Sequence, residues 1–220
     1  MQKFAIIVAG GSGTRMRSEL PKQFISVAGK PILMHSLEAF NFDSTQIILV
    51  LPKKQISFWK ELCQKNAFFL AHKIVEGGSS RFESVQNGLN SIAEADGLVA
   101  IHDGVRPIIK KEIIKDSFAQ AKEKGNAIVS VPLKDSIRII DGEKNYAKDR
   151  AAFRLIQTPQ TFKVQLIKEA FDSATHTNFT DDASVLEAYG KEIHLIEGDY
   201  RNIKITTPED LMVAESYLEA

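Results

Sequence analysis

The sequence predicts an α/β fold in which helices cover both faces of a mostly parallel sheet. Short apolar, β-branched runs, such as residues 4–9, are typical of strands that are buried on both faces. Segments with helical spacing lie between these runs, and this alternation favours parallel strands joined by helices. The chain has 220 residues, of which 44% are hydrophobic and 25% charged, so we expect one globular domain or at most two.

The predicted elements follow one another along the chain. Strands are expected at 4–9, 46–51, 98–101, 127–131 and 192–196. Helices are expected at 31–40, 80–92, 110–124, 180–189 and from 207 onward. Pro31 suits a first helical turn, whereas Gly125 and Gly190 suit the residue just after a helix. Ser80 and Glu83 have the spacing of a capping box.

The stretch from 134 to 157 breaks this alternation. Two segments of alternating polarity flank Asp141-Gly142, a pattern that predicts a β-hairpin arm. A hairpin that stands alone is marginal in water and leaves Ile137, Ile139 and Tyr146 exposed. Our preferred explanation is that a second copy of the chain covers the arm in a homodimer. A hairpin folded onto its own domain is the open alternative.

Composition argues against several classes of protein. The 28 Lys and Arg residues balance 28 Asp and Glu residues, so non-specific binding to nucleic acid or a membrane surface is not expected. No apolar run approaches the roughly 20 residues that a membrane-spanning helix needs, and the start does not resemble a signal peptide. Cys63 is the only cysteine, which excludes an intramolecular disulfide. We expect a cytoplasmic protein.

A glycine-rich turn follows the first predicted strand. Gly10, Gly11 and Gly13 allow backbone N–H groups to approach an anion closely, at the sheet edge where α/β proteins bind ligands. The turn is not a Walker loop, because Thr14 follows Gly13 where that loop has lysine. It is not a dinucleotide fingerprint either, since Met16 occupies the third glycine position. A glycine turn without a ligand is the alternative.

Charged residues near this edge suggest phosphate chemistry. Arg15 and Lys22, which we expect on a long loop, are two cations that could stabilise charge developing on a phosphoryl group. Asp103 ends a buried strand at the same edge, where a carboxylate is well placed to hold Mg²⁺. Arg106 could bind a phosphate with two hydrogen bonds. For His102 we expect a structural role.

Two further cations carry weaker signals on their own. Arg150 lies in the arm, and Lys204 lies in what we predict to be an alternating strand just before the last helix. Thr207 and Pro208 mark the start of that helix, where anions are favoured. The alternative for each cation is an ordinary solvated side chain.

Eight segments together resemble one family, the 2-C-methyl-D-erythritol 4-phosphate cytidylyltransferases of the non-mevalonate isoprenoid pathway. They are IIVAGGSGTRM, PKQF, EGGSSRFESV, IHDGVRP, VPLKDSI, TPQTF, FTDDASVLE and NIKITTPEDL, and they extend from residue 6 to residue 211. The resemblance implies a Rossmann-like nucleotidyltransferase domain over 1–220 with a β-arm at about 134–157. The reaction it implies uses CTP, a sugar phosphate and a divalent cation, Mg²⁺, and releases pyrophosphate.

The resemblance also implies roles for nucleotide-binding residues. Arg15 and Lys22 would stabilise charge at the α-phosphorus of CTP, and Asp103 would hold Mg²⁺ against the phosphates. The remaining members of the nucleotide site would be Ala9, Gly10, Gly11, Gly13, Gly78, Arg81, Ser84 and Gly104.

A second group would hold the sugar phosphate. By the same resemblance, Arg150 and Lys204 would position that phosphate for attack, with Arg106 and Ser136 nearby. Ser136 and Arg150 would act in the site of a neighbouring subunit, because the arm of this family crosses a dimer interface.

Two other functions are kept as alternatives. The first is a ribitol-5-phosphate cytidylyltransferase, which would share the glycine turn and the arm and differ in the sugar-phosphate pocket. The second is a non-catalytic nucleotide-binding protein, which is disfavoured because the cationic and metal-binding positions are all present. A dehydrogenase is disfavoured by the failed dinucleotide fingerprint.

Overall fold

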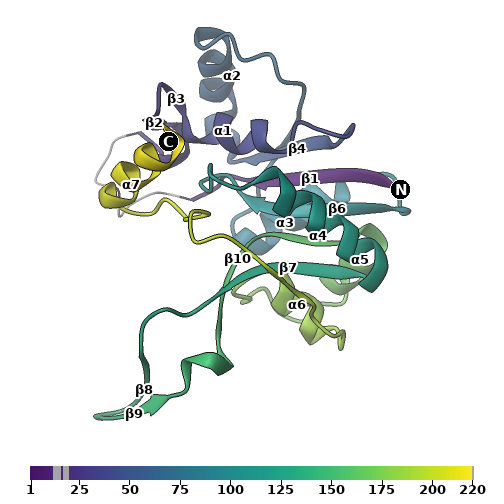
Figure 1. The fold of residues 1–220 in the computed structure, drawn as a ribbon. Helices are drawn as coiled ribbons and strands as arrows, with labels where there is room; N and C mark the ends of the chain where they lie inside the picture. Colours follow the sequence, from purple (N-terminus) through teal and green to yellow (C-terminus); the bar gives the residue numbers. More distant parts are fainter. Residues whose placement is uncertain (12–15, 17–19, 220) are drawn as a thin grey trace.

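The fold is built on one twisted sheet of seven strands (Figure 1). The computed structural model describes residues 1–11, 16 and 20–219. Across the sheet the strands are β11 (Leu195–Glu197), β7 (Asn126–Pro132), β10 (Arg154–Lys163), β6 (Gly97–Asp103), β1 (Gln2–Val8), β4 (Gln46–Leu51) and β5 (Lys73–Glu76). Only β10 is antiparallel to its neighbours among these strands, so the predicted, mostly parallel sheet is confirmed.

Helices cover both faces of the sheet, as predicted. One face packs against α1 (Ile32–Ala39), α2 (Ile56–Lys65) and α4 (Lys111–Lys124). The opposite face packs against α3 (Arg81–Asn90), α5 (Val164–Asp172) and α6 (Asp182–Ala188). Successive side chains of β1 serve the two faces in turn, with Ala5 and Ile7 in the first core and Phe4 and Ile6 in the second. No helix in the described part of the chain is long and apolar enough to cross a bilayer.

A smaller apolar cluster lies beside the main sheet. The short strands β2 (Ser26–Val27) and β3 (Lys30–Pro31) pair with each other next to α7 (Pro208–Leu218). Val27, Ile205 and Ala214 are buried together there. This packing ties the segment that precedes α7 to the region that follows the glycine turn.

The structure also corrects several predicted boundaries. Pro31 ends β3 and precedes α1 instead of lying in its first turn. Ser80 caps α3 by accepting the Glu83 N–H, and the Glu83 carboxylate also accepts hydrogen bonds from Ser79. Lys204 lies in an irregular segment, not in a strand, and the strand predicted at 192–196 is the shorter β11. Lys22 begins a 3-10 turn, Lys22–Phe24, where a loop was expected.

The arm protrudes from the body of the molecule (Figure 1). Strands β8 (Ile137–Asp141) and β9 (Lys144–Lys148) form a sheet of two strands that pairs with no other described strand. Gly142 makes the turn with a φ of 59°, a left-handed conformation that favours glycine. The predicted hairpin is therefore confirmed. It leaves Ile140 70% exposed and Tyr146 49% exposed.

Candidate active site

The candidate site lies where β1 and β6 end side by side. Val8 and Asp103 are paired in the register of these parallel strands, and the Gly104 N–H donates to the Val8 carbonyl over 2.9 Å. A Cβ atom at Gly104 would lie 2.9 Å from a Leu33 methyl and 3.0 Å from Ala9 Cβ. The turn after β6 therefore approaches the glycine turn this closely because residue 104 has no side chain.

A cavity of about 250 Å³ opens at this edge. Nine of the residues that the sequence proposed for the site line it: Ala9, Gly10, Gly11, Lys22, Gly78, Arg81, Ser84, Asp103 and Lys204. Sequence reasoning missed Val8, Gln23, Pro52, Ser79, Ser80 and Val105, which also line it. Gly104 packs behind the cavity instead of lining it. Gly13 and Arg15 lie outside the described residues.

The second glycine segment forms one wall of the cavity. The Ser84 hydroxyl accepts a hydrogen bond from the Gly78 N–H at 3.1 Å and donates to the Ser80 carbonyl at 2.8 Å. A Cβ atom at Gly78 would lie 2.3 Å from Glu83 Cβ, so only glycine fits there. The N-terminus of α3, capped by Ser80, thus lies at the cavity wall, where its partial positive charge favours an anion.

Arg81 joins this wall to α6. Its guanidinium makes two hydrogen bonds to the fully buried Asp182 carboxylate, at 2.8 and 2.6 Å. Burial opposes the charge on the guanidinium, but the Asp182 carboxylate outweighs it and raises the pKa of Arg81, so the arginine stays protonated. Because Arg81 also lines the cavity, it places a fixed positive charge at the cavity wall.

Asp103 is the centre of the charged cluster. Its Oδ2 atom lies 3.2 Å from Nε of Arg106 and 3.1 Å from Nζ of Lys204. Burial alone raises the pKa of the Asp103 carboxyl, but neighbouring cations, Lys204 foremost, hold the pKa far below its usual range. The group is therefore an anion at any physiological pH. The resemblance assigned Asp103 to the nucleotide and Arg106 and Lys204 to the sugar phosphate, and the structure brings both cations into direct contact with Asp103.

The donor set around Asp103 fits a magnesium ion. Both cations contact Oδ2, which leaves Oδ1 for a metal. The described residues contain no group of three or more His, Cys, Asp or Glu side chains that could hold a metal. Mg²⁺ commonly binds through one or two carboxylates, with water and substrate phosphates as its other ligands. One buried carboxylate beside a cavity of about 250 Å³ meets that requirement.

Lys22 and Gln23 link the cavity to two other segments. The Lys22 ammonium donates to the Ile205 carbonyl over 3.2 Å. The Gln23 amide is buried and donates to the Ala9 carbonyl over 2.9 Å. These contacts fix the 3-10 turn between the glycine turn and the segment that carries Lys204.

A second cavity, of about 270 Å³, adjoins the first. Arg81, Asp103 and Lys204 line both cavities. The other lining residues are Arg106, Ile156, Gln157, Thr158, Gln160, Thr180 and Asp181. Except for Arg106, sequence reasoning assigned none of these to the site. The segments TPQTF and FTDDASVLE contain four of them, Thr158, Gln160, Thr180 and Asp181, and were the signal that could have indicated those four.

His102 is fully buried and packs against Phe40, with ring centroids 5.0 Å apart. Burial lowers the pKa of its imidazole to about 4, so the ring is neutral near pH 7. Its hydrogen-bond partners are Arg106 and Thr158. The second partner lies in β10, within the TPQTF segment.

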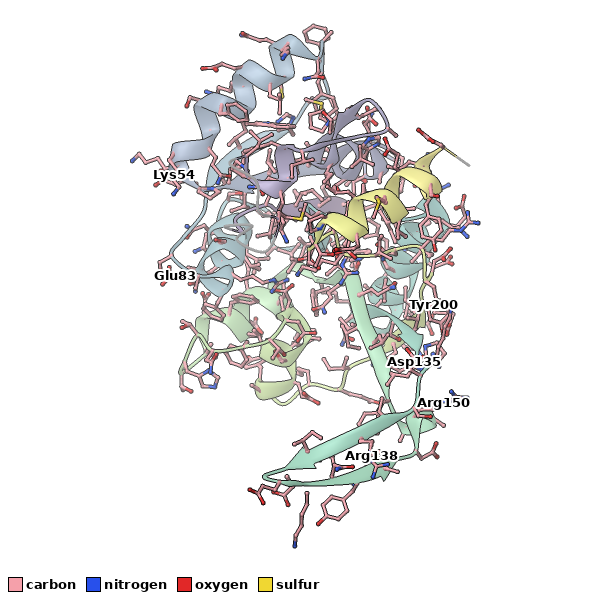
Figure 2. The ribbon with its side chains drawn as sticks, turned by 90° about the vertical axis from the view of Figure 1, so that its left-hand side faces the viewer. Lys54, Glu83, Asp135, Arg138, Arg150 and Tyr200 are labelled. Carbon is pink, nitrogen blue, oxygen red and sulfur yellow. The ribbon has the colours of Figure 1, made fainter. Side chains whose placement is uncertain are left out.

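Ser136 and Arg150 line neither cavity. Figure 2 shows Arg150 at the root of the arm and Arg138 farther along the hairpin. The Arg150 guanidinium donates to the Lys134 carbonyl. The root itself is anchored, because the Lys134 ammonium lies 3.6 Å from the centroid of the Tyr200 ring. The structure thus leaves the two predicted arm residues outside the site of their own chain.

The two adjoining cavities share the cations Arg81 and Lys204, and the first cavity lies beside a glycine turn at the carboxyl edge of an α/β sheet. Such a pair of cavities suits a nucleoside triphosphate and a phosphorylated acceptor. This arrangement defines a nucleotidyltransferase. Comparison with known families agrees: the profile of the 2-C-methyl-D-erythritol 4-phosphate cytidylyltransferases matches residues 3–220. The chain therefore belongs to that family, and the resemblance seen in its motifs is confirmed.

Individual relatives and solved structures give the same result. A 2-C-methyl-D-erythritol 4-phosphate cytidylyltransferase of Bacteroides thetaiotaomicron is 47% identical over 220 residues, covering 99% of this chain and 100% of that protein. The corresponding Clostridium perfringens protein is 42% identical over 221 residues and 98% of each chain. The crystal structure of an Anaerococcus prevotii 4-diphosphocytidyl-2C-methyl-D-erythritol synthase, 30% identical, superposes with a TM-score of 0.84 over 100% of this chain and 96% of that one.

Proposed function

We propose that this chain, as one nucleotidyltransferase domain, transfers the cytidylyl group of CTP to 2-C-methyl-D-erythritol 4-phosphate. An oxygen of the substrate phosphate attacks the α-phosphorus in line, the bond between that phosphorus and the bridging oxygen breaks, and pyrophosphate leaves. The observation that carries this proposal is the pair of cavities that share Arg81, Asp103 and Lys204. A triphosphate in the first cavity and a phosphate in the second would meet at these charges.

Positioning and charge supply the catalysis, since the protein has little covalent chemistry to perform. The nucleotide would lie along Gly10, Gly11 and Gly78. Lys22, with Arg15, would stabilise the negative charge that grows at the α-phosphorus. Lys204 borders both cavities, so it would hold the attacking phosphate next to CTP.

Asp103 would hold Mg²⁺, with phosphate oxygens and water as its other ligands. When bound, the ion would neutralise charge on the triphosphate. Asp103 itself needs no proton change for this role, because its neighbours keep it ionised.

We also propose a homodimer in which the arm completes the partner's site. Ser136 and Arg150 would contact the sugar phosphate bound by the other subunit, with Arg106 of that subunit's own chain nearby. The absence of both arm residues from their own cavities supports this sharing, as do the exposed side chains Ile140 and Leu155. The reaction is proposed to take place in the cytoplasm, where CTP is available. The lack of a nucleic-acid or membrane partner stays a prediction.

Pyrophosphate release tests the function directly. The purified protein is given CTP and Mg²⁺ with either 2-C-methyl-D-erythritol 4-phosphate or ribitol 5-phosphate. We expect release with the first acceptor only. Release with ribitol 5-phosphate only would keep the mechanism and overturn the substrate. Binding of CTP without release in either reaction would point to a non-catalytic nucleotide-binding protein.

A further inference from the structure

A buried hydrogen-bond relay connects His102 to both ends of the turn that follows β6. The His102 Nε2–H group donates to the Arg106 carbonyl over 3.0 Å. At the other side of the ring, Nδ1 lies 3.0 Å from Oγ1 of Thr158 and accepts its hydroxyl proton. That same Oγ1 accepts the Asp103 N–H at 3.1 Å. One side chain therefore fixes the first residue of the turn through Thr158 and the last residue directly.

The direction of each hydrogen bond in this relay follows from its ends. The Arg106 carbonyl can only accept and the Asp103 N–H can only donate, so the proton positions on the ring and the hydroxyl are determined. His102 is 0% exposed and Thr158 is 5% exposed, so water does not replace either contact. All the polar atoms of the two side chains are used.

The relay acts on the residues that carry charge into the site. Asp103 and Arg106 form an ion pair within the turn, and the Arg106 guanidinium also donates to the Asn202 carbonyl over 2.8 Å. The Ile205 N–H donates to the Val105 carbonyl over 2.9 Å, which holds the Lys204 segment against the same turn. A shift of the turn would therefore move Asp103, Arg106 and Lys204 together.

We propose that His102 is a positioning residue that orients the Asp103 carboxylate for Mg²⁺ and CTP. This inference rests on the proposed function, since it assigns Asp103 to the metal. Groups that orient a metal ligand typically change metal affinity or activity by about 10–100-fold when they are removed. A role in packing alone would affect stability and leave the metal dependence of nucleotide binding unchanged.

Titration calorimetry of CTP, with and without Mg²⁺, separates these possibilities. His102→Phe keeps a ring against Phe40 and removes both hydrogen bonds. We expect it to weaken CTP binding about tenfold in the presence of Mg²⁺ and much less in its absence. His102→Asn, whose carbonyl can accept from Thr158 near the position of Nδ1, should recover part of the loss.

Thr158 provides a second probe that does not depend on the folding of the histidine variants. Thr158→Val removes the hydroxyl from the relay, and Thr158→Ser keeps it. The matched control is Thr161→Val, on the same strand, because Thr161 is also buried and donates to Ser117 at 2.8 Å, away from both cavities. We expect Thr158→Val to lose the gain in CTP affinity that Mg²⁺ provides. Both Thr158→Ser and Thr161→Val should keep that gain.

Two results would overturn the proposal. One is a gain in CTP affinity on adding Mg²⁺ that is the same in Thr158→Val and His102→Phe as in the wild type. In that case the variants would lose only thermal stability, as Thr161→Val does. The other is wild-type CTP binding that does not respond to Mg²⁺. Failure of the proposed function is a separate observation, namely no pyrophosphate release by the wild type with either acceptor, and the binding comparison can still be made in that case.

Discussion

The turn at 103–106 and the arm at 134–157 both carry residues proposed for catalysis, in opposite surroundings. Asp103 is 7% exposed and contacts two cations. Arg150 is exposed, and its guanidinium donates to the carbonyl of Lys134, within its own arm. The turn is preorganised by the body of the molecule, whereas the arm presents its cation outward. In the proposed dimer, one chain would therefore build part of a site in place and carry another part to its partner.

The largest effect is expected for a residue in the part of the site that the body of the molecule forms. Lys22→Ala should lower kcat by about 10²–10³-fold, because its charge matters most in the transition state, and should weaken CTP binding much less. Steady-state kinetics of pyrophosphate release measures both quantities. Lys30→Ala is the control, since Lys30 pairs with Glu38 and lines neither cavity. An unchanged kcat with only a raised KM for CTP would contradict this role.

A substitution of Arg81 tests how much the buried ion pair with Asp182 contributes to stability. Arg81→Met leaves the buried Asp182 carboxylate without its cation and should cost about 3 kcal/mol of stability at neutral pH. Burial raises the pKa of Asp182, so the folded variant keeps a proton that the unfolded chain has lost. The unfolded state then binds fewer protons, and stability falls as pH rises from about 4.

Urea unfolding at pH 5 and pH 7.5 measures this difference. The free energy of unfolding that Arg81→Met loses relative to the wild type should be smaller at pH 5 than at pH 7.5. The double variant Arg81→Met/Asp182→Asn has no carboxyl to titrate there and should show no such pH dependence. Equal losses at the two pH values in the single variant would rule out an uncompensated Asp182 carboxylate as the cause.

On the arm, Arg150→Ala should affect the acceptor and not the nucleotide. We expect its KM for the sugar phosphate to rise about tenfold, with stability unchanged, because an exposed arginine contributes little to folding. Arg138→Ala, a substitution on the same arm, serves as the control and should change neither value. Loss of CTP affinity in Arg150→Ala would contradict the assignment of this arginine to the sugar phosphate.

The smallest effects are expected at two glycines that both have a positive φ. Gly142 turns the arm and Gly125 ends α4, with φ values of 59° and 93°. Alanine should cost about 1 kcal/mol at each. For Gly125→Ala the loss should appear in global unfolding. For Gly142→Ala it should appear only as faster amide exchange in the arm, and an equal fall in global stability would show that the arm is part of the cooperative core.

Much of the fold could be predicted because burial and capping leave local signals. The apolar strands β1, β4 and β6 and the glycine at the end of α4 are examples. Strand β10 was missed because it carries buried polar residues, among them Gln157, Thr158 and Gln160, in place of an apolar run. Their burial is compensated by hydrogen bonds to distant segments, such as Gln160 to Asp181, which no local pattern reveals.

The site was predicted in part for a similar reason. The carboxyl ends of β1 and β6 had to meet at one edge, so Asp103 and the glycine turn could be placed together from the sequence. The pairing of Arg81 with Asp182 could not, because 101 positions separate them and either could have been a surface charge. Lys204 was expected on a strand, but the buried Asn202 holds its segment in an irregular path by donating to Thr158 and Gln157.

Mixing two impaired variants tests the central claim most directly. Lys22→Ala and Arg150→Ala subunits are combined, and exchange is confirmed by native mass spectrometry. Pyrophosphate release is then measured with the sugar phosphate well below its KM, where Arg150→Ala alone should keep about a tenth of wild-type activity. If the arm serves the partner, each mixed dimer has one site with both cations. Random mixing makes half of the dimers mixed, so we expect about one quarter of wild-type activity. No activity above that of the separate variants, with mixed dimers present, would contradict the account.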